Sequence, residues 1–185
     1  MTHRKVYLLN PNTLALLPEK DSSGRLYSRV YEGHESFLVK KSPKDIMKES
    51  LIYYGSYLKG ATIAAKDILG VSRMVPIAVC MSLDMYWFPT HSPDNDECMW
   101  FSLVHIDEIK PSGYFYTTLF FLNGLVLRLP FKKKRLEGKI YNAGKLKHIM
   151  DERTKNKKML LYLDNFNKAM EYPCKYIARK RNHRE

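Results

Sequence analysis

An Asn-Gly pair at positions 123 and 124 is the feature that most restricts how this chain can fold. The runs on either side, 114–122 and 125–129, are rich in Tyr, Phe, Thr, Leu and Val, which favour strands. A two-residue type I′ turn needs positive φ at both central residues, and Asn and Gly tolerate that backbone best. The sequence therefore predicts a β-hairpin whose two-residue loop consists of Asn123 and Gly124.

Short β-prone runs separated by turn residues predict further antiparallel strands through the first 130 residues. The expected strands lie at residues 5–9, 13–17, 25–31, 36–40, 77–81, 85–88 and 99–106. One helix is expected among them, over residues 42–59, because Ser42 can cap it, Pro43 suits its first position and Asp45 lies in its first turn. Gly55 lies inside that pattern and indicates either a weaker helix or close packing.

The composition changes after Pro130, where a run of basic residues precedes helical patterns at 145–153 and 160–170. The predicted fold class is therefore α+β, an antiparallel, hairpin-rich β body with one inserted helix and a basic helical C-terminal part. We expect the body over residues 1–130 and the basic, mainly helical region over 131–185, the two forming one structural unit.

The net charge of +12 is concentrated at one end of the chain. Residues 131–185 contain 17 basic and 6 acidic side chains, whereas residues 61–130 contain 4 and 7. Such asymmetry is typical of proteins that bind a polyanion, either a nucleic acid or an anionic membrane, although a lysine-rich surface gives the same count. Since no run of 18 apolar residues occurs and the three cysteines are widely spaced, we expect a cytoplasmic protein that does not span a membrane.

Motifs for catalysis or metal binding are weak. His91, Cys98 and His105 have six residues between neighbours, and no Cys-x-x-Cys or His-x-x-x-His pair accompanies them. The acidic residues within 94–97 fit a solvated loop better than a cation site. Because the chain also has no nucleophile elbow and no phosphate-binding P-loop, we expect neither a metal nor an enzyme.

The basic C-terminal third has a clear physical use, because each Lys or Arg that neutralises a phosphate releases counterions. The run 132–135 follows the hairpin, where it either projects from a rigid scaffold or forms a solvated arm. Tyr53, Tyr54 and Tyr57 could stack on bases, but their helical spacing favours core packing. The candidate DNA-binding residues, chosen by charge and placement, are Lys132, Lys133, Lys134, Arg135, Lys139, Lys145, Lys147 and Arg153, with Lys44, Lys48 and Lys59 near the first helix.

Residues 50–130 carry a set of short motifs that are specific by their order and spacing. The set comprises SLIYYG over 50–55, Tyr57, Gly60, Pro76 and Ile77, FPT over 88–90, Trp100, His105 and Ile106, Asn123 and Gly124, and Leu129 and Pro130. By these motifs the chain resembles the ComK family of competence transcription factors. The first 40 residues match that family only in general character.

The resemblance implies a bacterial activator of DNA-uptake genes that acts at the nucleoid. It implies binding to double-stranded A/T-rich boxes largely through the minor groove, as dimers that combine into tetramers, with RNA polymerase as an indirect partner and no cofactor. An adaptor of a Clp-type protease is a further implied partner, although Leu163 stands where the family has proline. The corresponding adaptor-binding segment is Met159, Leu160, Leu161, Tyr162 and Leu163.

Two other functions are consistent with the residues alone. An RNA-binding protein would carry the same basic charge. A gel-shift titration that compares binding to RNA, to A/T-rich DNA duplex and to G/C-rich DNA duplex would distinguish the two functions. A small nuclease would need a metal-binding carboxylate cluster in a cleft beside the basic surface.

Overall fold

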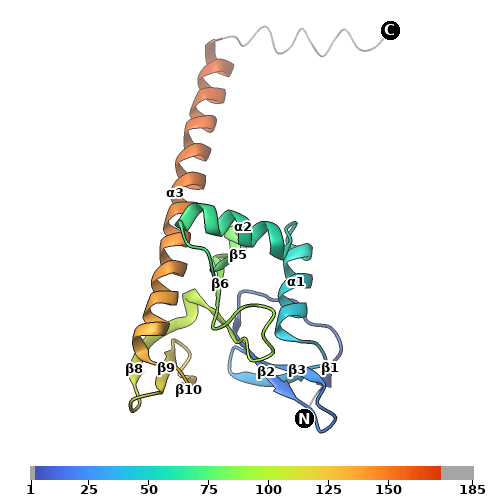
Figure 1. Ribbon diagram of the computed structural model, residues 1–185. Helices are drawn as coiled ribbons and strands as arrows, with labels where there is room; N and C mark the ends of the chain where they lie inside the picture. Colours follow the sequence, from blue (N-terminus) through green and yellow to red (C-terminus); the bar gives the residue numbers. More distant parts are fainter. Residues whose placement is uncertain (1–2, 172–185) are drawn as a thin grey trace, which may run out of the picture. The chain divides into compact units, whose positions relative to one another are not determined.

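A computed structural model describes residues 3–171, with side chains over residues 4–154 (Figure 1). It divides into two compact units, residues 1–148 and residues 149–185. Within the described residues of the first unit, strands form a seven-stranded sheet and a three-stranded sheet. The predicted α+β class with an antiparallel, hairpin-rich body is confirmed.

The larger sheet has the strand order β1-β4-β3-β2-β7-β6-β5. Neighbouring strands are antiparallel, except that the two-residue β1 runs parallel to β4. Two groups of strands meet in the middle, where Ala15 pairs with Phe101 and Leu16 with Trp100. The strands are β1 (His3–Arg4), β2 (Thr13–Lys20), β3 (Leu26–Glu32), β4 (Glu35–Val39), β5 (Ile77–Cys80), β6 (Met85–Pro89) and β7 (Trp100–Ser102).

The smaller sheet contains the predicted hairpin, in the order β10-β9-β8. Its strands are β8 (Ile106–Pro111), β9 (Thr117–Phe121) and β10 (Val126–Leu129). The position of the turn is confirmed, but its two-residue type I′ geometry is wrong, because Gly124 has a φ of 86° whereas Asn123 is not among the positive-φ residues. The N–H of Gly124 donates to the Phe121 carbonyl at 2.9 Å, and the Phe121 N–H donates to the Leu125 carbonyl at 2.9 Å. The loop therefore has three residues, ending in a left-handed glycine.

Two helices replace the single helix expected over residues 42–59, so that prediction is wrong in extent. They are α1 (Pro43–Tyr53) and α2 (Leu58–Leu69). The predicted start is confirmed, because the Ser42 hydroxyl accepts from the Asp45 N–H at 3.1 Å. The helix ends early because Gly55 adopts a left-handed backbone with a φ of 81°. Gly60 lies in the first turn of the second helix, where a Cβ atom would lie 2.9 Å from the Tyr57 ring.

The C-terminal helix, α3 (Lys133–Glu171), is continuous where two separate helical segments were expected. Its residues up to His148 belong to the first unit and the rest to the second. Two further expectations were wrong in detail, and one strand was missed. Residues 5–9 lie outside the strands, 3-10 helix η2 (Leu103–His105) interrupts the expected strand 99–106, and β8 was not foreseen.

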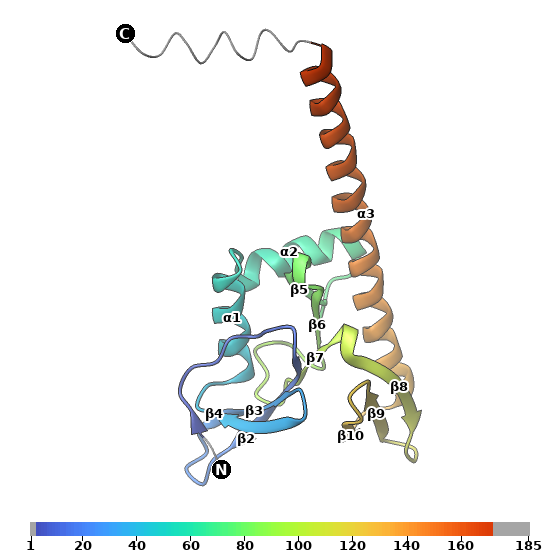
Figure 2. The same cartoon turned by 180° about the vertical axis from the view of Figure 1, so that it is seen from behind.

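The hydrophobic core of the first unit joins both sheets to the beginning of α3. Phe88, Phe101 and Leu14 from the larger sheet pack with Leu119 from the smaller one and with Leu136 from the helix. On another part of the larger sheet, α2 packs on β5, and α1 packs on β2 and β5 (Figure 2). The small sheet and the first turns of α3 are thus held by a shared core, which fixes the loops and side chains that they carry.

Candidate nucleic-acid interface

Three consecutive aromatic residues occupy the end of the loop that joins β8 to β9. Tyr114, Phe115 and Tyr116 are 75%, 63% and 43% exposed, respectively. Cationic side chains from β10 and from the segment that begins α3 lie beside them. We call this group the aromatic–basic cluster, and it consists of Tyr114, Phe115, Tyr116, Arg128, Lys132 and Arg135.

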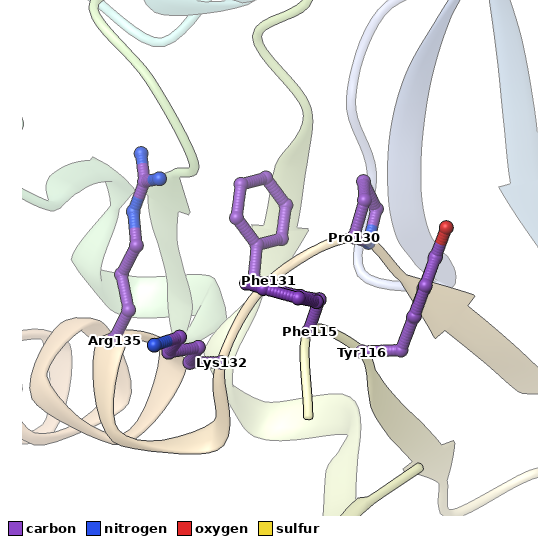
Figure 3. Close-up of a pocket in the computed structure, with 6 residues that line it drawn as sticks. All are labelled: Phe115, Tyr116, Pro130, Phe131, Lys132 and Arg135. Atoms are coloured by element: carbon purple, nitrogen blue, oxygen red, sulfur yellow. The ribbon is translucent and has the colours of Figure 1, made fainter. Parts of the chain in front are cut away.

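A hollow of about 340 Å³ lies within this cluster. Figure 3 shows its walls, with Phe115 and Tyr116 on the loop before β9 and residues 130–132 on the segment that leads into α3. Arg135, one helical turn further along, completes the lining. Apolar walls with two cationic groups at the edge suit a ligand that is both flat and anionic, such as part of a nucleic acid.

Cations in the cluster lie over aromatic rings. The Lys132 Nζ atom is 4.2 Å from the centroid of the Tyr114 ring and 5.5 Å from that of Phe115. The Arg128 guanidinium carbon is 4.3 Å from the centroid of the Tyr116 ring. These cation–π contacts hold positive charge at the protein surface beside the exposed rings.

Buried hydrogen bonds position the cluster. The hydroxyl of Thr117, at the start of β9, donates to the Phe131 carbonyl at 2.7 Å, both groups being buried. This bond joins the end of the aromatic loop to the residue before Lys132. Arg135 donates to the Thr90 carbonyl at 3.1 Å and lies over the Phe131 ring at 4.8 Å. The segment between β10 and α3 is therefore fixed to both sheets.

The His91 ring contributes a further contact below this segment. Its centroid is 5.3 Å from that of Phe131. Burial is the main cause that lowers the pKa of His91, and the positive charge of Arg135 lowers it further. A neutral His91 leaves the local positive charge to the guanidinium and ammonium groups of the cluster.

The structure separates the predicted lysines and arginines of the C-terminal region into groups. Lys132, Lys134, Arg135 and Lys145 are exposed in the first unit, and Arg153 is exposed in the second. Three others are only partly exposed and contact other side chains. Lys133 lies 3.5 Å from Glu137, Lys147 pairs with Asp84, and Lys139 is half-buried with its Nζ atom 3.7 Å from the Met74 sulfur.

Burial and the charge of Arg135 together lower the pKa of Lys139 to about 8, with burial the larger cause. Lys139 is therefore a poorer candidate for phosphate contact than its exposed neighbours. Among the residues near the first helix, Lys44 pairs with Asp94, whereas Lys48 and Lys59 are exposed. The acidic loop that carries Asp94 thus neutralises one of the lysines selected by charge.

Sequence reasoning missed the aromatic loop and Arg128. Residues 114–116 were assigned to a strand because Tyr and Phe favour strands, but β9 begins only at Thr117. The turn-forming residues Pro111, Ser112 and Gly113 were the available signal. Core packing was also wrong for Tyr53 and Tyr57, which are exposed, although the Tyr54 hydroxyl donates to the Leu9 carbonyl at 3.0 Å.

Other chemistry finds little support in the described part of the chain. Over these residues, no group of three His, Cys, Asp or Glu side chains is placed to hold a metal ion. None of the helices searched in that part is both long and apolar enough to cross a membrane. The side chains of the adaptor-binding segment expected at 159–163 lie outside the described residues.

The fold and the cluster define a basic α+β protein with a cationic, aromatic surface. Residues 4–155 match the family model described as ComK protein, and the chain belongs to that family, as the motifs of residues 50–130 indicated. A competence transcription factor from Bacillus subtilis (strain 168) is 30% identical over 147 residues, covering 80% of this chain and 76% of that protein. No solved structure matches the chain.

Proposed function

We propose that this protein is a transcription activator of competence genes that binds A/T-rich double-stranded DNA, largely through the minor groove. The printed function of the Bacillus subtilis relative and membership of the ComK family support the role in transcription. The observation that carries the DNA contact is the aromatic–basic cluster, where exposed rings and cations meet on a fixed scaffold. In this role the protein acts in the cytoplasm, at the nucleoid, as a binding protein and without catalysis.

The shape of the cluster favours the minor groove. A helix with its side chains is about 10–12 Å across, whereas the minor groove is only about 6 Å wide. The exposed rings project from a loop, so they can enter a narrow groove, with Arg128 on the strand beside them. A narrow A/T-rich minor groove also has an enhanced negative potential that attracts Arg and Lys.

The exposed cations near the start of α3 supply phosphate contacts. Lys134 and Arg135 lie in the first turn of the helix and Lys132 directly precedes it, and both Lys132 and Arg135 line the cluster hollow. Phosphate contacts fix the orientation of a protein on DNA but do not read its sequence. We therefore assign orientation to these cations and preference for A/T pairs to the groups that enter the groove.

Self-association is a second part of the proposal. Paired DNA boxes require a dimer, and tetramers form when two dimers combine on DNA. Three exposed apolar side chains offer surface for this association: Ile52 on α1, Ile63 on α2 and Tyr57 directly before α2. An adaptor of a Clp-type protease is proposed as a further partner, bound through residues 159–163, and RNA polymerase as an indirect one.

Base substitution tests the groove. Replacing A·T pairs by I·C leaves the minor-groove pattern nearly intact and changes the major groove, whereas G·C places a guanine amino group in the minor groove. In gel-shift titrations at constant salt, binding should survive I·C and fail with G·C. Loss of binding with I·C would contradict minor-groove recognition.

The same titration separates the rival functions. Tighter binding to RNA than to any DNA duplex would favour an RNA-binding protein and contradict the proposal. Cleavage of the DNA on addition of Mg²⁺, abolished by a chelator, would instead identify a nuclease. Intact DNA that shifts only as A/T-rich or I·C-containing duplex is the expected result.

A further inference from the structure

The loop that joins β8 to β9 carries an unusual amount of exposed aromatic surface. Tyr114 and Phe115 are the most exposed aromatic residues of the cluster, and Tyr116 follows them directly. Neighbouring apolar groups that remain exposed mark an interaction site more often than scattered ones do. These two rings therefore need an occupant that covers them.

The loop is organised before any ligand arrives. The Ser112 N–H donates to the Tyr116 carbonyl at 2.9 Å, which closes the loop, and Gly113 provides the left-handed backbone with a φ of 89°. The Tyr114 and Phe115 rings meet edge to face, with centroids 4.7 Å apart and planes at 86°. Because the rings brace one another, little side-chain freedom remains to be lost on binding.

Charge around the rings decides the kind of occupant. Lys132 lies over both rings and Arg128 over the adjacent Tyr116. Cations beside exposed rings, in a chain of net charge +12, favour a partner that is both flat and polyanionic. DNA has both properties, because its base pairs are flat and apolar and the phosphates on either side of them are anionic.

We propose that Tyr114 and Phe115 act as a wedge that enters one base-pair step from the minor groove, while Lys132 and Arg128 hold the flanking phosphates. This inference rests on the proposed DNA-binding function. Apolar side chains inserted between base steps partly unstack them. Pyrimidine–purine steps such as TA unstack most readily, so the wedge selects a TA step within an A/T-rich box.

Fluorescence of 2-aminopurine, which rises when the base is unstacked, tests the wedge. We would place the probe at each step in turn of an A/T-rich duplex and titrate it with the full-length protein. The signal should rise at one pyrimidine–purine step and stay flat elsewhere. Binding with no rise at any step would overturn the wedge while leaving the DNA-binding function intact, whereas absence of duplex binding would overturn that function.

The variant Y114A/F115A should bind without the fluorescence rise. Its affinity should fall by about 5- to 150-fold, the range expected for losing one stacked base contact. The slope of log affinity against log salt should not change, because Lys132 and Arg128 remain. Since both rings are exposed, its thermal unfolding midpoint should match that of the unmodified protein. A retained fluorescence rise in this variant would overturn the assignment.

Two further variants separate the alternatives. Y114L/F115L should keep the fluorescence rise because a wedge needs apolar bulk, and its loss would indicate aromatic stacking on an unpaired strand instead. The matched control is Y53A on α1, where Tyr53 is 67% exposed and meets Tyr54 edge to face at 5.0 Å. The Y53A variant should give the same fluorescence rise as the unmodified protein. Loss of the rise in Y53A would indicate that α1 unstacks the bases and would overturn the proposal.

Discussion

Replacing Arg128, Lys132 and Lys134 together by Ala would measure how many phosphates these three exposed cations neutralise. All three side chains are exposed, and two of them lie over the aromatic rings. Each cation that neutralises a phosphate adds about 0.9 to the slope of log affinity against log salt. Three lost contacts should therefore lower the magnitude of that slope by about 2.7. The affinity ratio between unmodified protein and variant should shrink by about 40-fold between 50 and 200 mM salt.

Fluorescence anisotropy titrations of a labelled A/T-rich duplex at four or five salt concentrations would give both slopes. The matched control is K44A/K147A, which removes two positive charges that are already paired with Asp94 and Asp84. Its slope should stay close to that of the unmodified protein, because those lysines do not release DNA counterions while the pairs persist. Equal slopes for the triple variant and the unmodified protein would refute the assignment of these three cations to the phosphates.

Three predictions concern stability and can be measured by urea unfolding. Gly124→Val should lower the free energy of unfolding by about 1–3 kcal/mol through backbone strain alone, since a Cβ there meets nothing within 4 Å. Gly138→Ala has equally open space but lies in helix α3, so it should raise the free energy of unfolding by about 0.5–1 kcal/mol. Thr117→Val should cost about 1–3 kcal/mol, because it leaves the buried Phe131 carbonyl without its donor, and an unchanged midpoint would contradict this. Lys139→Met should stabilise the protein by about 1–2 kcal/mol at pH 7, a range reduced for solvent screening of this partly exposed ammonium. The pKa of Lys139 is about 8 in the folded protein and 10.5 ordinarily, so between pH 8 and pH 10.5 the unfolded chain binds more protons than the folded one. The unmodified protein should therefore gain stability as the pH rises through this range. The stability advantage of the Met variant should fade over the same range.

Local sequence signals were sufficient where one residue dictates the backbone. Gly124 marked the hairpin correctly because its left-handed conformation is costly for other residues. Ser42 marked the start of α1 because its hydroxyl satisfies an N–H group of the first turn. The same reasoning gave the wrong loop length at Asn123, whose side chain instead donates to the Gly33 carbonyl and accepts from the Leu125 N–H at 3.1 Å. That tertiary contact between two loops has no local signature.

Tertiary packing determined the features that sequence patterns missed. The helix expected over 42–59 is divided by the left-handed Gly55, and α2 begins at Leu58, where a Cβ on Gly60 would meet the Tyr57 ring. Lys139 was chosen for its charge, and no sequence pattern indicates the burial that lowers its pKa to about 8. The exposure of Tyr114 and Phe115 follows from where the loop closes, which composition alone does not reveal.

The central pairing of the larger sheet has a consequence for biosynthesis. Ala15 on β2 pairs with Phe101 on β7, 86 positions later in the chain. At about 5–20 residues per second, ribosomes need roughly 4–17 s to make the intervening segment. Throughout that interval the N-terminal hairpin has an open edge along β2, and open edges invite pairing with other chains. Nascent copies of this protein on neighbouring ribosomes are therefore most vulnerable to co-aggregation before β7 has emerged, and chaperone demand should fall once it has.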